Sequence, residues 1–110
     1  QDLERMINSD TTTVLIATNK DDQIVGTMTL VLFRIPTGLR AWIEDVIVDS
    51  ESQGKGIGKK LNQKALTIAE KAGAKTVELT SRPSREAANR LYQNLGFEKR
   101  ETNIYRFTFD

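Results

Sequence analysis

The feature that most constrains this chain is the stretch VDSESQGKGIGKKLNQKAL, from Val48 to Leu66. An apolar, β-rich run ends where the stretch begins, and a helical pattern of apolar residues starts within it. Between the two stand glycines at three alternate positions, Gly54, Gly56 and Gly58. Glycine costs about 0.8–1 kcal/mol relative to alanine inside a helix, so three at a helix start require a physical reason. We expect a ligand to approach this backbone closely.

The hydrophobic pattern on either side of the glycines predicts alternating strands and helices. The predicted helices cover residues 1–9, 55–72 and 84–96. The predicted strands cover residues 13–18, 24–33, 40–48, 75–80, 97–100 and 104–109, with the last two as a closing hairpin. Hairpin strands joined by helical crossovers predict an α/β (α+β) fold, in which a mixed, largely antiparallel sheet is flanked by helices.

Each of the two longer predicted helices carries one apolar face. In the first, this face consists of Ile57, Leu61, Ala65, Ile68, Ala69 and Ala72. In the second, Ser84 is expected to be the N-cap, with Ala87, Leu91 and Leu95 facing inward. Tyr92 would then lie at the edge of the inward stripe, a position that suits a group facing a cleft.

Length and composition narrow the function classes. The 110 residues suffice for one domain with one core, expected over residues 1–110. The net charge of +1 does not favour nucleic acid or a membrane as a partner. Cysteine and histidine are both absent, which excludes thiol nucleophiles and the usual zinc sites, so no metal is expected. Without a long apolar run or a signal-peptide pattern, a cytoplasmic location is expected.

The backbone at the start of the helix after the glycines is suited to an anion. A helix N-terminus leaves its first N–H groups unpaired and carries a partial positive charge, and glycines let an anion lie against it. Lys55, Lys59 and Lys60 oppose the helix dipole, which is easier to explain if a polyanion occupies the site. The alternative is a solvated lysine-rich face whose charge Asp49 and Glu51 balance.

Two common nucleotide-binding patterns fit this stretch poorly. The P-loop pattern G-x-x-x-x-G-K-[ST] is absent, which argues against a nucleoside triphosphatase. In the dinucleotide-binding fingerprint the third glycine would fall at Lys59. The stretch also follows a hairpin strand instead of the first strand of a parallel βαβ unit.

A third pattern fits better. QGKGIG, residues 53–58, matches the [RQ]-x-x-G-x-[GA] signature of the GCN5-related N-acetyltransferases (GNAT). The longer stretch WIEDVIVDSESQGKGIGKKL resembles that family's fourth strand, pyrophosphate loop and third helix. SREAANRLYQNLGFEK resembles its fourth helix, including the A-x-x-L-Y-x-x-x-G-F ending. The resemblance runs from about Thr13 to the C-terminus.

The resemblance implies that acetyl-CoA binds in a wedge where the fourth and fifth strands splay apart. Backbone groups of Val46, Ile47 and Val48 would pair with the pantetheine arm as an added strand does, since a strand without a neighbour cannot complete its ladder. The pyrophosphate would be cradled by the backbone of Gln53, Gly54, Lys55, Gly56, Ile57, Gly58 and Lys59.

On the fourth helix of the family, the matching residues are Asn89 and Tyr92. By resemblance, Asn89 contacts the cofactor arm and Tyr92 protonates the departing CoA thiolate. The alternatives are that Tyr92 is an aromatic at the rim of the core with its hydroxyl in water, and that Asn89 is a residue of the helix surface.

The general base is expected among the carboxylates of the fourth strand, because an amine nucleophile must lose a proton. Family members often carry a glutamate there, and the matching residue is Glu44. Asp45, predicted on the opposite face of the strand, and water are alternatives. Some members place the base two residues earlier, where this chain has Trp42. The non-catalytic alternative for either carboxylate is an ion pair with an arginine such as Arg40, Arg82 or Arg85.

The function implied is N-acetyl transfer from acetyl-CoA to a primary amine in one ternary complex, with no metal. A strand-four backbone N–H would stabilise the oxyanion, and the absence of cysteine excludes a thiol-bound acetyl-enzyme. The acceptor is a small-molecule or protein amine; IEDVIVD also resembles glucosamine-phosphate acetyltransferases, so an amino sugar is one candidate. A nucleic-acid-binding module is disfavoured because no aromatic platform accompanies the lysines.

The family's first strand and first helix have no counterpart in this sequence, and Ser50 stands where a proline is common. The chain is therefore expected to be trimmed or shortened, which leaves its acceptor specificity open. The alternative function is a non-catalytic CoA-binding module or a truncated, inactive fragment. The closing edge strand is expected to support a homodimer.

Overall fold

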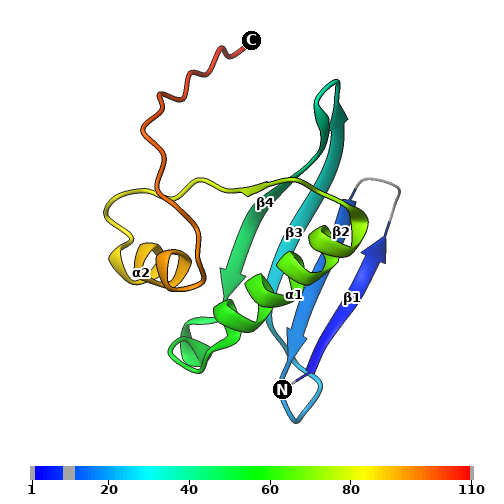
Figure 1. Cartoon of the computed structure of the whole chain (residues 1–110). Coiled ribbons are helices and arrows are strands. Elements are labelled where there is room, and N and C mark those ends of the chain that lie inside the picture. Colours follow the sequence, from blue (N-terminus) through cyan, green and yellow to red (C-terminus); the bar gives the residue numbers. More distant parts are fainter. Residues whose placement is uncertain (1, 9–11, 110) are drawn as a thin grey trace. The chain divides into compact units, whose positions relative to one another are not determined.

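A computed structural model describes residues 2–8 and 12–109, with side chains from residue 12 onward. The chain divides into two compact units, residues 1–80 and residues 81–110. The first unit holds the sheet and the longer helix, and the second holds the shorter helix and the C-terminal segment (Figure 1).

The first unit is a mixed sheet with one helix on its face. Its strands are β1 (Asp2–Asn8), β2 (Thr12–Thr18), β3 (Ile24–Ile35), β4 (Gly38–Val48) and β5 (Val77–Glu78), in that spatial order. β1 to β4 are antiparallel neighbours, whereas β5 runs parallel to β4. A 3-10 turn, η1 (Ser50–Ser52), precedes helix α1 (Ile57–Ala72), which crosses one face of the sheet (Figure 1). The predicted fold class is confirmed.

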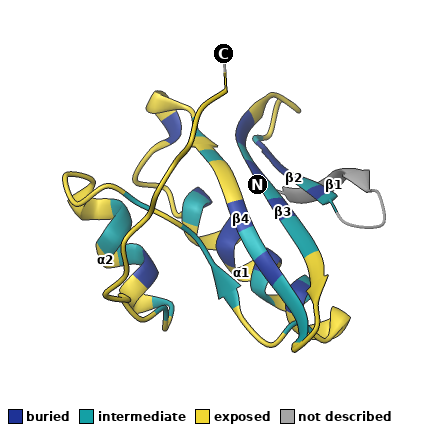
Figure 2. Ribbon diagram, turned by 90° about the horizontal axis from the view of Figure 1, so that it is seen from above, coloured by how far each residue is buried: buried dark blue, intermediate teal, exposed yellow. Residues whose placement is uncertain are grey.

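The core lies between α1 and the covered face of the sheet (Figure 2). On β3, Gly26 allows the closest approach: a Cβ there would stand 2.8 Å from Ile57 Cγ2. Most of the predicted apolar stripe of α1 is buried or half-buried, although Ala72 is exposed. The buried apolar residues of the strands and α1 are Leu15, Ile16, Ala17, Val25, Met28, Leu30, Ala41, Ile43, Ile57, Leu61, Ala65 and Ala69.

The helix predicted over residues 1–9 is wrong, because residues 2–8 form β1. This strand pairs antiparallel with β2, from Asp2↔Thr18 to Asn8↔Thr13. A shift in register between Arg5 and Ile7 leaves one extra residue in β1. Such a bulge breaks the two-residue period on which a strand prediction depends, and leaves apolar residues at a spacing that resembles a helix.

The second unit contains α2 (Glu86–Asn94), which is shorter than predicted. Its N-cap is Arg85, so the assignment of Ser84 as the cap is wrong. Ala87 is exposed, against expectation, whereas Leu91 and Leu95 are half-buried as predicted. The buried face is therefore rotated from the predicted one, away from Ala87.

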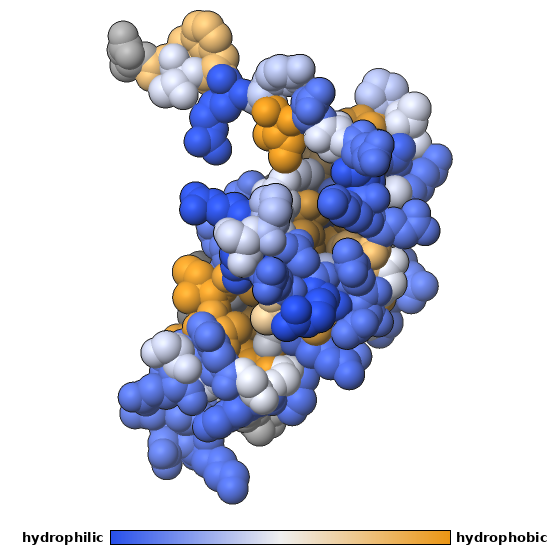
Figure 3. Space-filling model, turned by 90° about the vertical axis from the view of Figure 1, so that its left-hand side faces the viewer, coloured by the Kyte–Doolittle hydropathy of each residue, from blue (hydrophilic) through white to orange (hydrophobic). Residues whose placement is uncertain are grey.

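The predicted strands near the C-terminus are corrected in two ways. β5 has two residues instead of the six predicted over 75–80. Residues 97–109 form no strand, so the closing hairpin predicted there is wrong. A strand needs a partner to satisfy its backbone, and the apolar side chains that suggested one remain 72–88% exposed (Figure 3). They are Ile104, Tyr105, Phe107 and Phe109.

In the part of the chain that the structure describes, no helix has both the length and the apolar character of a membrane span.

Candidate active site

The loop before α1 owes its shape to two of the three glycines. Gly54 has φ 82° and Gly56 has φ 79°, both in the left-handed region that favours glycine. A Cβ at either position would meet no other atom within 4 Å. The backbone conformation, not crowding by the protein, therefore requires glycine there, and the space above both residues is open to a ligand.

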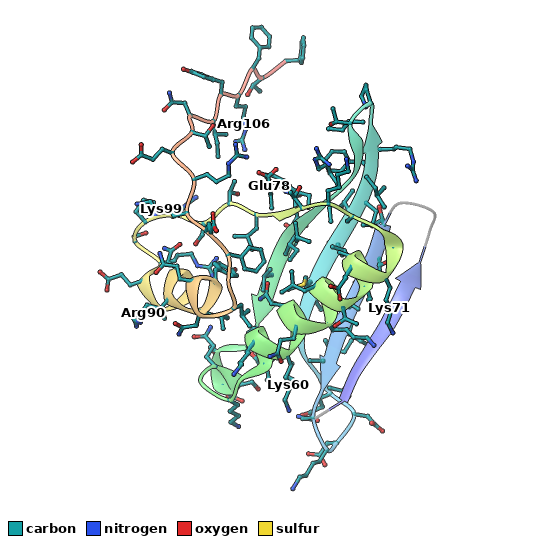
Figure 4. The ribbon with its side chains drawn as sticks, viewed as in Figure 1. Lys60, Lys71, Glu78, Arg90, Lys99 and Arg106 are labelled. Atoms are coloured by element: carbon teal, nitrogen blue, oxygen red, sulfur yellow. The ribbon has the colours of Figure 1, made fainter. Side chains whose placement is uncertain are left out.

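Helix α1 begins without the capping or acidic side chains that usually compensate the unpaired N–H groups and partial positive charge of a helix N-terminus. Gly56 is the N-cap, no side chain caps the helix, and its first turn contains no acidic residue. Lys59 and Lys60 lie in that turn, and both are exposed; Figure 4 shows Lys60 projecting from this end of α1. The first-turn N–H groups, the dipole and the lysines all favour an anion at this point.

The side chain of Gln53 fastens the loop to the end of β4. Its Nε2 donates a hydrogen bond of 3.3 Å to the carbonyl of Val48. The buried side chain of Ile57 instead packs toward β3, close to Gly26. Ile57 thus has only its backbone to offer a ligand, whereas Lys55 is exposed on the loop.

β4 has a partner on its outer edge for only part of its length. β5 pairs with it at Ala41 and Trp42 alone. Among the described residues, no strand adjoins that edge from Ile43 to Val48. Backbone donors and acceptors on this edge can therefore pair with an extended ligand that carries amides.

Alternate residues of a regular strand direct their backbone N–H and C=O groups to the same edge, which decides which residues of β4 serve its free edge. The N–H of Asp49 donates to Val25 on β3 at 2.8 Å. Backbone groups of successive strand residues point to opposite sides, so Ile47, which pairs with Thr27, faces β3 and Val48 faces the free edge. Of the three residues predicted to hold the pantetheine arm, Val48 is directed to the free edge, Ile47 is directed to β3, and Val46 lies in an irregular part of the strand.

A β-bulge interrupts β4 where the free edge begins. Between the pairs Thr29↔Glu44 and Thr27↔Ile47, β3 has one residue and β4 has two. Asp45 adopts φ 54°, a left-handed conformation that is uncommon for a residue other than glycine. The extra residue leaves backbone groups outside the β3 ladder, at the start of the free edge of β4.

Both carboxylates of β4 are exposed. The prediction placed Glu44 and Asp45 on opposite faces of the strand; in the structure Asp45 lies in the bulge, and neither residue is buried. Glu44 instead accepts a hydrogen bond of 2.8 Å from the indole Nε1 of Trp42, which is half-buried. The indole fixes the position of one carboxylate beside the free edge.

In the second unit, Tyr92 is the buried residue of α2, with 8% of its surface exposed. Its ring meets that of Phe97 edge-to-face, with 5.8 Å between the centroids. Burial raises the pKa of the Tyr92 hydroxyl above its ordinary value, and the positive charge of Arg85 opposes the shift only in part. The hydroxyl therefore keeps its proton at neutral pH and is available as a donor.

Asn89 supports the start of α2. Its Nδ2 donates to the carbonyls of Arg82 and Arg85, each at 2.9 Å. These bonds tie the segment before the helix to its first turn. Asn89 and Tyr92 are three residues apart, on neighbouring positions of the helix surface.

These features agree with comparisons to known proteins. The model of the "Acetyltransferase (GNAT) family" matches residues 1–97. The chain belongs to this family. N-alpha-acetyltransferase 30 of Schizosaccharomyces pombe is 35% identical over 71 residues, which cover 64% of the chain and 47% of that protein. Mycothiol acetyltransferase of Renibacterium salmoninarum is 33% identical over 87 residues, which cover 77% of the chain and 26% of that protein.

Solved GNAT structures also share the fold. An aminoglycoside acetyltransferase from a soil metagenome superposes with a TM-score of 0.84 at 23% identity, covering 94% of the chain and 69% of that structure. The chain spans about a quarter to a half of the length of the curated relatives that it matches.

Three features of this GNAT domain were not predicted from the sequence. They are the bulge at Asp45, the hydrogen bond from the indole of Trp42 to Glu44, and the buried polar residue Asn62 within the apolar face of α1. The first two depend on strand pairing. Asn62 could have been noticed from its helical spacing, because it lies three residues before Ala65 and seven before Ala69, on the apolar face. The described residues contain no group of three or more side chains suited to hold a metal ion.

Proposed function

We propose that this domain transfers the acetyl group of acetyl-CoA to a primary amine by direct attack in a ternary complex. The observation that carries the proposal is the continuity between the free edge of β4 and the glycine loop. An extended ligand with amides in its middle and phosphates at one end is complementary to both.

The cofactor's pyrophosphate would lie against the backbone from Gln53 to Lys59, at the uncapped N-terminus of α1. The pantetheine arm would extend along β4 and pair with backbone groups of Val46 and Val48. Asn89 is proposed to contact the arm with the amide oxygen that its two bonds leave available. These groups bind and orient the thioester; the acetyl group that is transferred belongs to the cofactor.

The chemistry requires one proton to leave the amine and one to reach the thiolate. The amine nitrogen attacks the thioester carbonyl, and a backbone N–H at the bulge of β4 stabilises the resulting oxyanion. Glu44 takes the amine proton, directly or through water. The C–S bond then breaks, and Tyr92 supplies a proton to the sulfur. The exposed Asp45 is the alternative base.

The acceptor is proposed as a small-molecule or protein amine, because relatives of this chain include a mycothiol acetyltransferase and an N-alpha-acetyltransferase. A second candidate function is a CoA-binding module without turnover. It requires only the free edge of β4 and the glycine loop, which belong to one compact unit.

Calorimetric titration of the 110-residue chain with acetyl-CoA tests the proposal. We expect micromolar binding, and Gly56→Glu should abolish it by placing a charge in the anion site. Gly73→Glu is the matched control at the other end of α1, because Gly73 also has a left-handed φ, 90°, and a Cβ there would likewise meet no atom within 4 Å. If a folded chain fails to bind, the proposal is wrong. Binding without acetylation of any amine in a broad panel would favour the second candidate.

A further inference from the structure

Asn62 is a polar residue in the middle of the core, with 0% of its surface exposed. Its Nδ2 donates a hydrogen bond of 2.8 Å to the carbonyl of Gly58, one turn earlier in α1. Its Oδ1 is also buried and has no hydrogen-bond partner among the described residues. The amide orientation follows from chemistry, since the reverse would set two oxygens 2.8 Å apart.

Stability does not explain an amide at this position. A buried acceptor without a partner is costly, and the neighbouring buried positions of α1 are filled by Leu61 and Ala65. A leucine, which has the same branched skeleton, would remove the cost at position 62 and add apolar contact. The amide therefore indicates a functional role at the one group to which its side chain is hydrogen-bonded, the carbonyl of Gly58.

That carbonyl belongs to the same peptide group as the N–H of Lys59. Lys59 lies in the first turn of α1, where N–H groups have no partner within the helix. A carbonyl that accepts a side-chain bond in addition to its helical bond polarises its peptide group, which strengthens the N–H at the other end as a donor. The bond also restricts the rotation that glycine at position 58 would otherwise allow.

We propose that Asn62 is a positioning residue for the anion site: it fixes and polarises the Gly58–Lys59 peptide group so that the Lys59 N–H binds a phosphate oxygen. The inference rests on the proposed function, since the phosphate is that of CoA. It adds a residue outside the glycine loop, in the core, to the groups that determine cofactor affinity.

Two variants separate positioning from packing. Asn62→Leu removes the donor and keeps the branched skeleton of the side chain. Asn62→Thr restores a donor to the same carbonyl, as Thr67 does in this helix, where its Oγ1 donates to the Gln63 carbonyl at 3.0 Å. Acetyl-CoA affinity, the thermal midpoint, and the NMR shift of the Lys59 amide proton without ligand are measured for all three proteins.

We expect Asn62→Leu to weaken acetyl-CoA binding by about three- to tenfold, the worth of one neutral hydrogen bond, with an unchanged or higher thermal midpoint. The Lys59 amide proton should move upfield, and Asn62→Thr should restore both its shift and the affinity. Unchanged affinity in Asn62→Leu, a lower midpoint, or no rescue by threonine would each overturn the proposal.

The ligand-free NMR measurement keeps this inference distinct from the proposed function. If the wild-type chain does not bind acetyl-CoA, the function is wrong, whereas the Lys59 shift still reports whether Asn62 polarises the peptide group. If the wild-type chain binds and Asn62→Leu binds equally well, only the role of Asn62 is wrong.

Discussion

Trp42 donates its indole N–H to the carboxylate of Glu44 at 2.8 Å, from two residues earlier in β4. Side chains two apart in a strand point to the same face, so the bond holds Glu44 beside the free edge without help from another element.

If Glu44 is the base, Glu44→Gln should lower kcat/KM by about a hundredfold or more, the usual worth of a positioned general base. The loss should shrink as the pH approaches the pKa of the acceptor, because the amine then arrives already deprotonated. Initial rates across neutral and alkaline pH measure both effects. Glu51→Gln, which changes an exposed carboxylate of η1, is the control. Equal rates for Glu44→Gln and wild type would transfer the role to Asp45 or water.

The indole bond can be tested apart from the ring. Trp42→Phe keeps an aromatic ring but removes the N–H, so kcat should fall by about three- to tenfold with little change in the KM for acetyl-CoA. In the Glu44→Gln background, Trp42→Phe should lower kcat no further, because the indole bond has already lost its charged acceptor. Additive losses in this double-mutant cycle would show that the indole acts independently of Glu44.

The pKa of Tyr92 predicts how stability depends on alkaline pH. The folded state holds the proton more tightly than the unfolded state, whose tyrosine titrates near pH 10. Its contribution is complete below about pH 10 and is lost as the pH rises through the folded-state pKa. Urea unfolding from neutral to strongly alkaline pH should therefore show a fall in stability that Tyr92→Phe reduces. An identical pH dependence in the variant would refute the shift.

The same variant tests catalysis. Tyr92→Phe removes the proposed proton donor, so kcat should fall while acetyl-CoA affinity stays near that of wild type. Tyr105→Phe is the matched control, because Tyr105 is exposed in the C-terminal segment. Full activity in Tyr92→Phe would leave Tyr92 with a packing role against Phe97.

The bulge of β4 leads to a prediction about the free energy of unfolding. Asp45 has φ 54°, a conformation that aspartate tolerates and glycine adopts freely. Asp45→Gly should therefore leave the free energy of unfolding nearly unchanged, whereas Asp45→Val should lower it by about 1–2 kcal/mol, since a β-branched residue resists this region. Urea denaturation measures both. If valine costs no more than glycine, Asp45 does not adopt the left-handed conformation in solution.

Local sequence patterns were sufficient to predict the elements whose structure depends on the periodicity of residues close in sequence. The spacing of Ile57, Leu61, Ala65 and Ala69 predicts α1, because burial of one helical face depends only on residues close in sequence. The glycine pattern likewise predicts the loop before α1 and the family, since a left-handed backbone and a close anion both select glycine at Gly54 and Gly56.

The features that depend on partners distant in sequence were decided only by the tertiary structure. Residues 2–8 are a strand because β2 offers an edge, although their apolar spacing also fits a helix. Asp45 leaves the ladder because one residue of β3 lies opposite two residues of β4. The C-terminal segment remains outside the sheet despite its strand-like pattern, since alternation specifies a face but not the strand that it pairs with. The glycine pattern thus locates the loop that we propose to bind the cofactor, and only the folded sheet shows which backbone groups lie beside it.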